Sequence, residues 1–553
     1  MPSAPLATLV ARDLTVAFGP TTVLDGVSLV AAPGDRIGVV APNGTGKSTL
    51  LKVLAGLIRP DRGTVTAMPG SATVGYRPQE PERRADEHVR DAVARRTGVT
   101  AAGAGLDAAT AAMAAGEVGA DDRYAAALER WLGLGAADLD QRLGELWASL
   151  GLTARLLDQP TASLSGGEAA RASLATLLLS RFDVLLLDEP TNDLDFAALA
   201  RLESFVTALD SPLVVVSHDR AFLDRTITAV VELDEHTRTA RRFEGGWSAY
   251  LEERATARRH AEAAYETYAT TRSELLGRIR RQRQWSQTGV TKAKKQPKDN
   301  DKAQRDFFTN RTEKQASKVR QSEKALARLD GVDKPWEPWE LRLSIGDAPR
   351  SGSVVARLSG AVVRRGSFQL GPVDLEIGWA DRVAILGPNG SGKTTLLNAL
   401  LGRLPLDAGD GWVGPGVVVG EIDQARGLLD GDRPLLDAFA SAAGYDAVPG
   451  GLTEARTLLA KFGLFADHVA RPGLSLSPGE RTRATLALLQ ARGANCLVLD
   501  EPTNHLDLPA IEQLEQAVEA FEGTVLLVTH DRQLLEAVSV DRTVTFTAPG
   551  ACT

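Results

Sequence analysis

The chain has 553 residues and a formal net charge of -8, and a chain of this length does not fold around one core, so we expect several domains. Its 43% hydrophobic and 24% charged residues are typical of a soluble globular protein. The sequence contains no run of 18 uncharged apolar residues, so we expect no membrane span. Two cysteines, Cys496 and Cys552, exclude a disulfide framework, and the first residues show no secretion signal, so we expect a cytoplasmic protein.

The first element with a chemical signature follows the apolar run GVV. The stretch APNGTGKSTLL, from Ala41, has the GxxxxGK[ST] pattern apart from its first residue. In that pattern backbone N–H groups and a lysine surround nucleotide phosphates, and the hydroxyl holds Mg²⁺. The ATP-binding residues predicted here are Asn43, Gly44, Gly46, Lys47, Ser48 and Thr49.

An alanine-rich stretch comes next, between Gln79 in VGYRPQE and the motif LSGGE at 164–168. This stretch is about 33 residues longer than the similar stretch between Gln424 and the motif LSPGE near the C-terminus. The additional residues fall near 97–140. Its composition predicts an added helical arm, with a lengthened surface loop as the alternative.

Two apolar strands close the first half, and each ends in residues that carry chemistry. VLLLDE ends in Asp188, which is placed for Mg²⁺, and Glu189, which is placed to orient and polarise an attacking water. VVVSHD puts His218 at another strand end, within reach of a γ-phosphate.

A basic linker follows. Residues 278–330 hold 16 Lys and Arg against 6 Asp and Glu, which leaves the rest of the chain at -18. Apolar spacing predicts two helices, about 247–285 and 305–330, that form an antiparallel hairpin around a turn with Gly289 and Pro297. Such a charge on an acidic body indicates a site for a polyanion, with a solvated helical face as the alternative.

The remainder of the chain repeats the motifs of the first part in the same order. GPNGSGKTTLL follows its counterpart by 346 residues, and LSPGE, LVLDEPTNHLD and LLVTHD follow theirs by 312. Four ordered elements found twice predict two homologous α/β halves. The corresponding candidates are Asn389, Gly390, Gly392, Lys393, Thr394, Thr395, Gln424, Ser477, Gly479, Asp500, Glu501 and His530.

With LSGGE and its neighbours in place, both halves resemble the ATPase domains of the ATP-binding cassette superfamily. The resemblance implies that the halves meet head to tail and sandwich two ATP molecules. Site one would join Lys47, Gln79, Asp188, Glu189 and His218 to Ser477 and Gly479. Site two would join Lys393, Gln424, Asp500, Glu501 and His530 to Ser165, Gly166 and Gly167.

Further site residues follow from the same resemblance. The Mg²⁺ ligands it implies are Ser48, Gln79, Asp188, Thr394, Gln424 and Asp500. An aromatic side chain stacks on adenine in the family, and Phe18 fits that place in the first half. In the second half the aligned residue is Arg364, whose guanidinium can stack, and Phe368 is the other candidate.

The sequence departs from the family pattern at two positions. Ala41 replaces the leading glycine of the first phosphate loop, and Pro478 replaces a glycine of the second LSGGE-like loop and removes an N–H. Both changes fall in site one, so we expect this site to turn over more slowly than site two.

The linker selects among families with two fused ATPase halves. Tandem ATPase subunits of transporters need only a short connection, UvrA-type repair proteins carry zinc-binding cysteines, and chromosome-associated relatives have far longer coiled coils. EPTNDLD, EPTNHLD, the insert before LSGGE and the basic linker resemble the ABC-F family over nearly the whole chain. The resemblance implies an α/β fold with two ABC-type P-loop ATPase domains, 1–245 and 341–553, joined by a long α-helical hairpin linker at 246–340.

For the ABC-F family the resemblance implies hydrolysis of ATP with Mg²⁺ by a monomer whose two halves form the ATPase pair. The partner would be the 70S ribosome, entered at the exit site, with the hairpin tip near the peptidyl-transferase centre. The basic residues that would meet rRNA or tRNA phosphates are Lys292, Lys294, Lys295, Lys298, Lys302 and Arg305. Phe307 and Phe308 would either stack on bases or pack the hairpin.

Within the family, the stretches WSQTG, TEKQASKVR and PWEPWELR resemble actinobacterial proteins linked to macrolide or lincosamide resistance. Ribosome protection is therefore the expected function. The alternatives are a translation-factor role without any drug and the ATPase subunit of a transporter with a separate membrane chain.

Overall fold

The structure, a computed structural model, describes residues 7–79, 82–235, 237–295, 321, 323–326, 350–366, 368–504, 506–548 and 550–552. Side chains are described for these residues except 282–295, 423–424, 478, 547–548 and 551–552. The chain divides into two compact units, of which one joins Met1–Trp247 to Leu341–Thr553 and the other is Ser248–Glu340.

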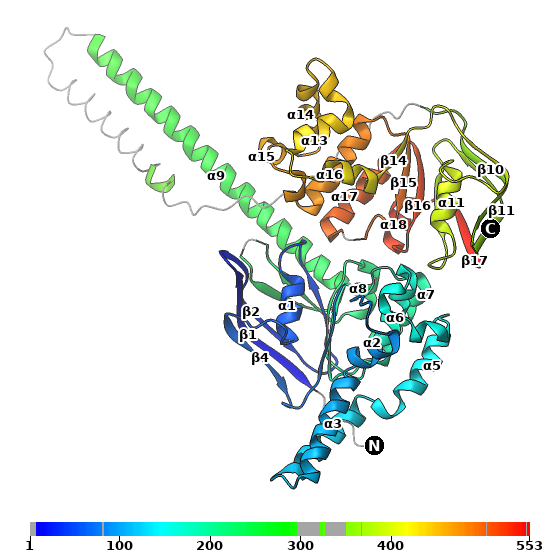
Figure 1. Ribbon diagram of the computed structural model, residues 1–553. Coiled ribbons are helices and arrows are strands. Elements are labelled where there is room, and N and C mark those ends of the chain that lie inside the picture. Colours follow the sequence, from blue (N-terminus) through cyan, green and yellow to red (C-terminus); the bar gives the residue numbers. More distant parts are fainter. Residues whose placement is uncertain are drawn as a thin grey trace. The chain divides into compact units, whose positions relative to one another are not determined.

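The first half contains two sheets (Figure 1). A three-stranded antiparallel sheet has the order β2-β1-β4, and a six-stranded sheet has the order β5-β6-β7-β3-β8-β9, parallel except for β9. The strands are β1 (Thr8–Phe18), β2 (Thr21–Ala31), β3 (Arg36–Val40), β4 (Arg62–Met68), β5 (Val74–Arg77), β6 (Val184–Asp188), β7 (Leu213–Val216), β8 (Ala229–Leu233) and β9 (Ala240–Glu244). Because β6 and β7 are buried along their whole length, they consist of continuous apolar runs.

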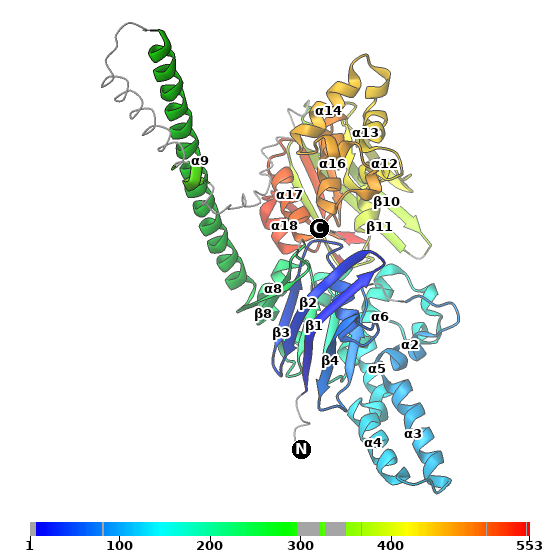
Figure 2. The same ribbon diagram turned by 90° about the vertical axis from the view of Figure 1, so that its left-hand side faces the viewer.

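Helices complete the first half, and two of them form the alanine-rich insert. The helices are α1 (Lys47–Leu54), α2 (Val89–Arg96), α3 (Val99–Ala114), α4 (Ala120–Gly133), α5 (Leu139–Ser149), α6 (Gly166–Leu179), α7 (Phe196–Thr207) and α8 (Arg220–Thr226). Helices α3 and α4 lie side by side (Figure 2). Of the two alternatives for this stretch, the structure therefore has helices.

The second half repeats this arrangement. Its sheets have the orders β11-β10-β13 and β14-β15-β16-β12-β17-β18, which match the first half strand for strand. The strands are β10 (Val354–Arg365), β11 (Phe368–Gly378), β12 (Arg382–Leu386), β13 (Ala408–Val413), β14 (Val419–Glu421), β15 (Cys496–Asp500), β16 (Thr524–Val528), β17 (Arg542–Ala548) and β18 (Ala551–Cys552). The helices are α11 (Lys393–Leu400), α12 (Ile422–Leu429), α13 (Leu435–Ala443), α14 (Gly451–Lys461), α15 (Ala466–Val469), α16 (Pro478–Ala491), α17 (Leu508–Glu519) and α18 (Arg532–Ala537).

The matching strand orders confirm the prediction of two homologous α/β halves. In each half the helix that follows the phosphate loop, α1 or α11, packs its apolar side chains into a core formed with both sheets. The strands β3, β6 and β7 are parallel neighbours, so their carboxyl ends meet at one edge of the sheet. The motifs that follow these strands in the sequence are thereby brought together.

The linker begins with one long helix, α9 (Trp247–Lys295), of 49 residues. It continues ten residues past the end expected at Trp285 and runs through Gly289, for which the sequence predicts a turn. A single glycine costs a helix only about 1 kcal/mol relative to alanine, which does not end a helix of this length. Of the second predicted helix, residues 321 and 323–326 are helical, and the rest of 305–330 lies outside the described residues.

The apolar stripe expected along α9 is found in part. The side chains of Tyr265, Tyr268 and Leu275 are half-buried and Ile279 is buried, whereas Ala261 is exposed. The two tyrosine rings lie 6.3 Å apart between centroids. Within the described part of the chain, no helix combines the length and the apolar character that crossing a membrane requires.

Candidate functional site

Both phosphate loops have the same backbone conformation. Gly44 and Gly46 have φ angles of 81° and 109°, and Gly390 and Gly392 have 79° and 108°. Glycine reaches these left-handed values at little cost, whereas other residues are strained there. Space is also limited, because a Cβ atom on Gly46 would lie 2.5 Å from Val23 Cγ1. The loops are thus shaped so that backbone N–H groups line a cradle ahead of α1 and α11.

The lysine at the start of each following helix folds back over its loop. Lys47 Nζ donates to the carbonyl oxygen of Ala41 at 2.8 Å and to Asn43 Oδ1 at 3.1 Å. Lys393 Nζ donates in the same way to the carbonyl oxygen of Gly387 at 2.8 Å. Burial lowers the pKa of both lysines. Each ammonium group is therefore a partly desolvated cation that phosphate oxygens can bind in place of the loop carbonyls.

A carboxylate at the end of the neighbouring strand approaches the hydroxyl after each lysine. Thr394 Oγ1 donates to Asp500 Oδ2 at 2.9 Å, and the hydrogen bond from Ser48 to Asp188 is its counterpart. Burial raises the pKa of Asp188, and hydrogen bonds from Ser48 and Tyr76 oppose that rise. Its Oδ1 atom is buried without a hydrogen-bond partner. Hydroxyl and carboxylate oxygens in this arrangement are the ligands that Mg²⁺ prefers.

The acid that follows, Glu189 or Glu501, has a strained backbone in both halves. Each has a φ angle of 47°, in the left-handed region that non-glycine residues rarely adopt. His218 Nε2 lies 3.1 Å from Glu189 Oε1, and His530 Nε2 lies 3.4 Å from Glu501 Oε1. Strain of this kind is often found at functional sites, and here it recurs at equivalent positions of both halves.

Burial sets the protonation of this acid–histidine pair. It raises the pKa of Glu189 and of Glu501 to about 7 each, although the nearby lysine lowers both. It lowers the pKa of His218 to about 3 and of His530 to about 4, and the same lysines contribute to that lowering. The histidines are therefore neutral at physiological pH, and the carboxyl groups titrate near the pH at which a general base is most effective.

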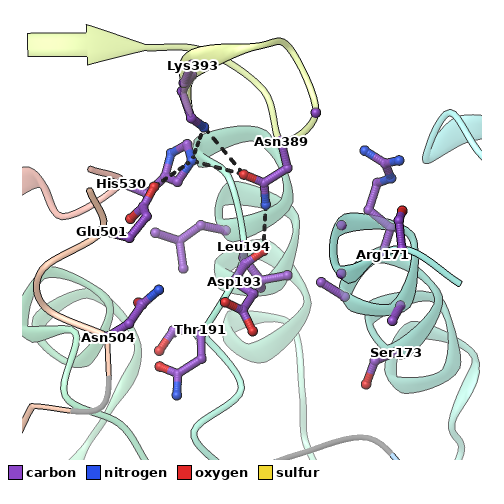
Figure 3. Close-up of a pocket in the computed structure, with 18 of the residues that line it drawn as sticks. Arg171, Ser173, Thr191, Asp193, Leu194, Asn389, Lys393, Glu501, Asn504 and His530 are labelled. Atoms are coloured by element: carbon purple, nitrogen blue, oxygen red, sulfur yellow. Dashed lines mark hydrogen bonds and ion pairs between the residues drawn. The ribbon is translucent and has the colours of Figure 1, made fainter. Parts of the chain in front are cut away.

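A cavity of about 1300 Å³ collects the residues predicted for site two (Figure 3). In that view Lys393, Asn389, His530 and Glu501 face Asp193 and Arg171, which come from the first half. Asn389 Nδ2 donates to the carbonyl oxygen of Asp193 at 2.6 Å. The predicted site-two residues that line it are Ser165, Gly166, Gly167, Asn389, Gly390, Gly392, Lys393, Thr394, Thr395, Asp500, Glu501 and His530.

The two halves approach closely at this cavity. A Cβ atom built on Gly167, in the LSGGE loop, would lie 3.5 Å from Asn389 Cβ of the second phosphate loop. Ser165 caps α6, where its Oγ accepts from the N–H of Glu168, whose own carboxylate accepts from the N–H of Ser165. The loop therefore presents the N–H groups at the start of α6 toward the phosphate loop, which is how a helix N-terminus binds anions.

Site one is assembled less completely in the described residues. Gln79 and His218, predicted for site one, line the same cavity as the site-two residues. The ammonium group of Lys47 does lie near Asp188 and Glu189, since both carboxylates are close enough to oppose the lowering of its pKa by burial. A Cβ atom built on Gly479 would meet Gln513 of its own half, so the place of Gly479 in site one, like that of Ser477, remains a prediction.

The adenine-stacking candidates differ in where they lie. Phe368 lines the cavity, and its ring packs against Gly392, where an added Cβ atom would lie 2.6 Å from Phe368 Cζ. Arg364 is not among the lining residues, and its Nε donates to Gln369 Oε1 at 3.1 Å. The geometry thus favours Phe368 over the aligned Arg364. Phe18 is 53% exposed at the end of β1.

The structure does not test the magnesium-ligand role predicted for the Gln424 side chain. Gln424 lies in the first turn of α12, and its side chain is outside those the structure describes.

Sequence reasoning missed the aspartate that ends each of the motifs EPTNDLD and EPTNHLD, which is Asp195 in the first half and Asp507 in the second. Asp195 Oδ2 accepts from the backbone N–H of Asn389 at 3.2 Å, and Asp507 Oδ2 accepts from the N–H of Asn43 at 3.0 Å. Each bond joins one half to the phosphate loop of the other. The signal was present in the sequence, because an aspartate before a helical run is a typical N-cap, but the partner in the other half was not.

Comparisons with known proteins agree with this geometry. Residues 24–192 and 370–504 match the family described as ABC transporter. The tylosin resistance ATP-binding protein TlrC of Streptomyces fradiae is 35% identical over 97% of this chain and 96% of its own. The energy-dependent translational throttle protein EttA of Mycobacterium tuberculosis is 33% identical over 95% and 89%. ABC transporter F family member 5 of Arabidopsis thaliana is 30% identical over 95% and 73%.

The chain belongs to the ABC-F family. The resemblance seen in its motifs is thereby confirmed, and as a member with two ABC ATPase domains it is an ATPase that binds ATP and hydrolyses it to ADP and phosphate. Among solved structures, a crystal structure containing the archaeal ribosome recycling factor aABCE1 has a TM-score of 0.53 at 20% identity, covering 97% of this chain and 88% of that one. RNase-L Inhibitor gives 0.52 at 19%, covering 98% and 88%. These two likenesses support the fold.

The structure gives a physical basis to the two departures from the ABC pattern. Gly387 has a φ angle of 151°, and a Cβ there would lie 2.6 Å from Phe546 Cβ, so the second loop requires glycine at its start. Ala41 packs against the core of the first half instead. Pro478 occupies the first position of α16, where Gly166 of α6 has an N–H and proline has none.

Because site one lacks this donor, we predict unequal turnover of the two sites in this ABC-F protein. Glu501→Gln alone should lower the steady-state ATPase rate at least about threefold more than Glu189→Gln alone, since losing one preorganised donor commonly costs far more than that in rate. The measurement is kcat for each purified variant at saturating ATP.

The control is Glu129→Gln on the exposed surface of α4, which should leave the rate unchanged. Equal losses in the two single variants, or a larger loss for Glu189→Gln, would contradict the asymmetry.

Proposed function

We propose that this ABC-F ATPase binds the 70S ribosome and protects it from macrolide or lincosamide antibiotics. The observation that carries the proposal is similarity along the whole chain to TlrC, a protein named for resistance to tylosin, which is a macrolide. The absence of a membrane-spanning helix among the described residues is compatible with this role. The same proposal places the protein in the cytoplasm, as a monomer whose two halves form one ATPase pair.

The linker supplies the surface for the ribosome. Lys292, Lys294 and Lys295 lie in the last turn of α9, about 70 Å along the helix from Trp247. Three cations at a helix C-terminus are stabilised by the helix dipole and are free of an acidic neighbour in the sequence KAKK. RNA phosphates are the polyanion such a cluster binds. Lys298, Lys302 and Arg305, proposed for the same surface, lie outside the described residues.

The catalytic residues proposed for ATP hydrolysis follow from the site geometry. Glu189 and Glu501 would each accept the proton of the attacking water at a carboxylate oxygen, for which a pKa of about 7 is suited. His218 and His530, neutral and beside these carboxylates, would orient the water and the γ-phosphate. The donors of Ser165, Gly166 and Gly167 would complete the second site from the opposite half.

The residues present also fit a magnesium ion. Ser48 and Asp188 in one half, and Thr394 and Asp500 in the other, would hold it, with the side-chain amides of Gln79 and Gln424 as the further ligands proposed. The orphaned Oδ1 atom of Asp188 supports this assignment. When bound, Mg²⁺ neutralises charge on the β- and γ-phosphates. Closure of the halves on ATP would favour ribosome binding, and hydrolysis would release it.

A second function has its own support. EttA is named as a translational throttle, and its identity of 33% over 95% of this chain is close to that of TlrC. A role in translation without any drug is therefore the competing proposal. The two differ in whether the protein changes the drug sensitivity of its host.

The first experiment measures antibiotic susceptibility of a sensitive bacterial host with and without this protein, against a panel of ribosome-targeting drugs. Wild type should raise the inhibitory concentration of macrolides or lincosamides severalfold. The Glu189→Gln, Glu501→Gln double variant should not, because it binds ATP without hydrolysing it, and it should pellet with 70S ribosomes in ATP.

Each outcome has a distinct meaning. Ribosome pelleting without any drug protection by wild type would favour the translation-factor role. Normal ATP hydrolysis by the double variant would remove both glutamates from the assigned role. Failure to pellet in ATP would contradict ribosome binding itself.

The second experiment changes Lys292, Lys294, Lys295 and Lys298 to Ala together. Ribosome affinity should fall at least about tenfold, and the slope of log affinity against log salt should flatten by up to about 3, because fewer counterions are released. ATP hydrolysis without ribosomes should stay within about twofold of wild type, because the substituted residues are remote in sequence from every ATPase motif.

A charge-matched control removes Arg254, Arg258, Arg259 and Arg272, which are exposed in the first part of α9. It should weaken binding less than the lysine variant. Unchanged affinity and salt slope in the lysine variant would mean that this segment is only a solvated end of the linker. Co-purification of a membrane chain would then support the transporter-subunit alternative.

A further inference from the structure

Two ion pairs join the halves at equivalent positions. Arg220 of the first half pairs with Glu515 of the second, and Arg532 of the second pairs with Glu203 of the first, the latter with 3.0 Å between Nη1 and Oε1. The arginines are 312 residues apart, and so are the glutamates. The same contact is therefore made twice, once in each direction, as a head-to-tail pair of similar halves requires.

These pairs differ from ordinary surface ion pairs. The side chains of Arg220 and Glu515 are 14% and 13% exposed, and those of Arg532 and Glu203 are 28% and 13% exposed. Exposed pairs contribute little to stability because water competes for both charges. Where charges are partly desolvated at an interface, pairing them matters more, since removing one partner leaves the other without compensation.

Each arginine lies two residues after an active-site histidine. Arg532 follows His530 and begins α18, and Arg220 follows His218 and begins α8. The residue between them caps that helix, because Asp531 Oδ1 accepts from the N–H of Leu534. A short, capped turn thus connects the arginine to the histidine. Fixing the position of the arginine therefore restrains the position of the imidazole.

Each glutamate lies on the helix that starts at the shared aspartate. Asp195 precedes α7 and accepts from the N–H of Asn389, and Glu203 lies eight residues on, about 12 Å along the helix. Helix α7 therefore contacts the second half at two points. Asp195 contacts the phosphate loop of the second half, and Glu203 contacts the turn that follows His530. Helix α17 does the same to the first half, through Asp507 and Glu515.

Helix α7 makes a further contact with site two. The ring of Phe196, in the first turn of α7, meets the His530 ring edge-on, with centroids 5.2 Å apart and planes at 81°. The Arg532 guanidinium lies 5.7 Å from the centroid of the Phe196 ring. The histidine of the second half is thus flanked by an aromatic ring from the first half, and the arginine behind it contacts the same ring.

We propose that Glu203 and Glu515 are positioning residues for ATP hydrolysis, each acting across the interface on the histidine turn of the opposite half. Neither glutamate is among the residues that line the cavity. They hold Arg532 and Arg220, and through these arginines they fix His530 and His218 beside Glu501 and Glu189. Because each glutamate belongs to the other half, the histidine is held in place only when the halves are closed, so hydrolysis is coupled to closure.

The test reverses charges at the Arg532–Glu203 pair. Arg532→Glu and Glu203→Arg should each lower kcat roughly tenfold and leave KM for ATP within about twofold, within the range of coupling measured for contacting charges. The double variant restores the opposite charges in exchanged places and should recover at least about a third of the wild-type kcat. The measurement is steady-state ATP hydrolysis by the full chain.

A matched control uses the other partner of the same carboxylate. Arg225 of the first half lies 3.2 Å from Glu203 and is 53% exposed, and Arg225→Ala should leave kcat within about twofold. Arg532→Gln with Glu203→Gln removes both charges without leaving one unpaired, and it should lower kcat while thermal unfolding shows a folded protein.

The outcomes separate positioning from a purely structural role. Unchanged kcat in the two single reversals or in the neutral double variant would overturn the proposal. So would a folded charge-exchanged variant that does not recover activity, because the pair would then not act as a pair. If a single reversal does not fold, the neutral and charge-exchanged variants decide the question.

Discussion

One carboxylate in each half accepts two N–H groups, and the sites depend on this sharing. Asp195 Oδ1 accepts from the N–H of Ala198 at 3.0 Å and so caps α7, and its Oδ2 atom accepts from the N–H of Asn389. Asp507 does the same for α17 and Asn43. An N-cap contributes about 1 kcal/mol to its helix, but here the same group also fixes the opposite phosphate loop. Local helix geometry and the geometry between the halves are therefore linked through one residue.

The bonds around Glu189 and Glu501 explain how their strained backbone is maintained. A left-handed conformation at Glu189 or Glu501 costs about 1–3 kcal/mol, and the neighbouring bonds hold it. The N–H of Glu189 donates to the carbonyl oxygen of Val216, and Thr191 Oγ1 lies 2.9 Å from Ser217 Oγ. The turn from the acid to the shared aspartate is thereby tied to the strand that carries the histidine. The carboxylate, the histidine and the interface contact are consequently set by one short segment.

Much of this arrangement could be predicted from the sequence, because it depends on order along parallel strands. The phosphate loop, the acid pair and the histidine each follow an apolar strand, and parallel strands bring their carboxyl ends to one edge. The resemblance indicated that the LSGGE loop would meet the opposite phosphate loop, but the pairs Glu203–Arg532 and Asp507–Asn43 could not be predicted, because no local pattern relates these residues to one another. The residue that would stack on adenine in the second half stays a prediction, because alignment indicates Arg364, whereas β11 brings Phe368 over Gly392. Helix α9 is longer than the sequence predicts, because a single glycine such as Gly289 costs a helix only about 1 kcal/mol and does not end it.

Each half contributes one aspartate to the phosphate loop of the other, Asp195 to the loop with Asn389 and Asp507 to the loop with Asn43. Hydrogen exchange of the backbone amides of Asn43 and Asn389 measures this directly, in wild type and in the Asp195→Ala and Asp507→Ala variants, each with ATP bound. We expect Asp195→Ala to speed exchange at Asn389 and to leave exchange at Asn43 unchanged, and we expect Asp507→Ala to do the reverse. If each substitution speeds exchange only in its own half, at the start of the helix it caps, the aspartates do not join the halves.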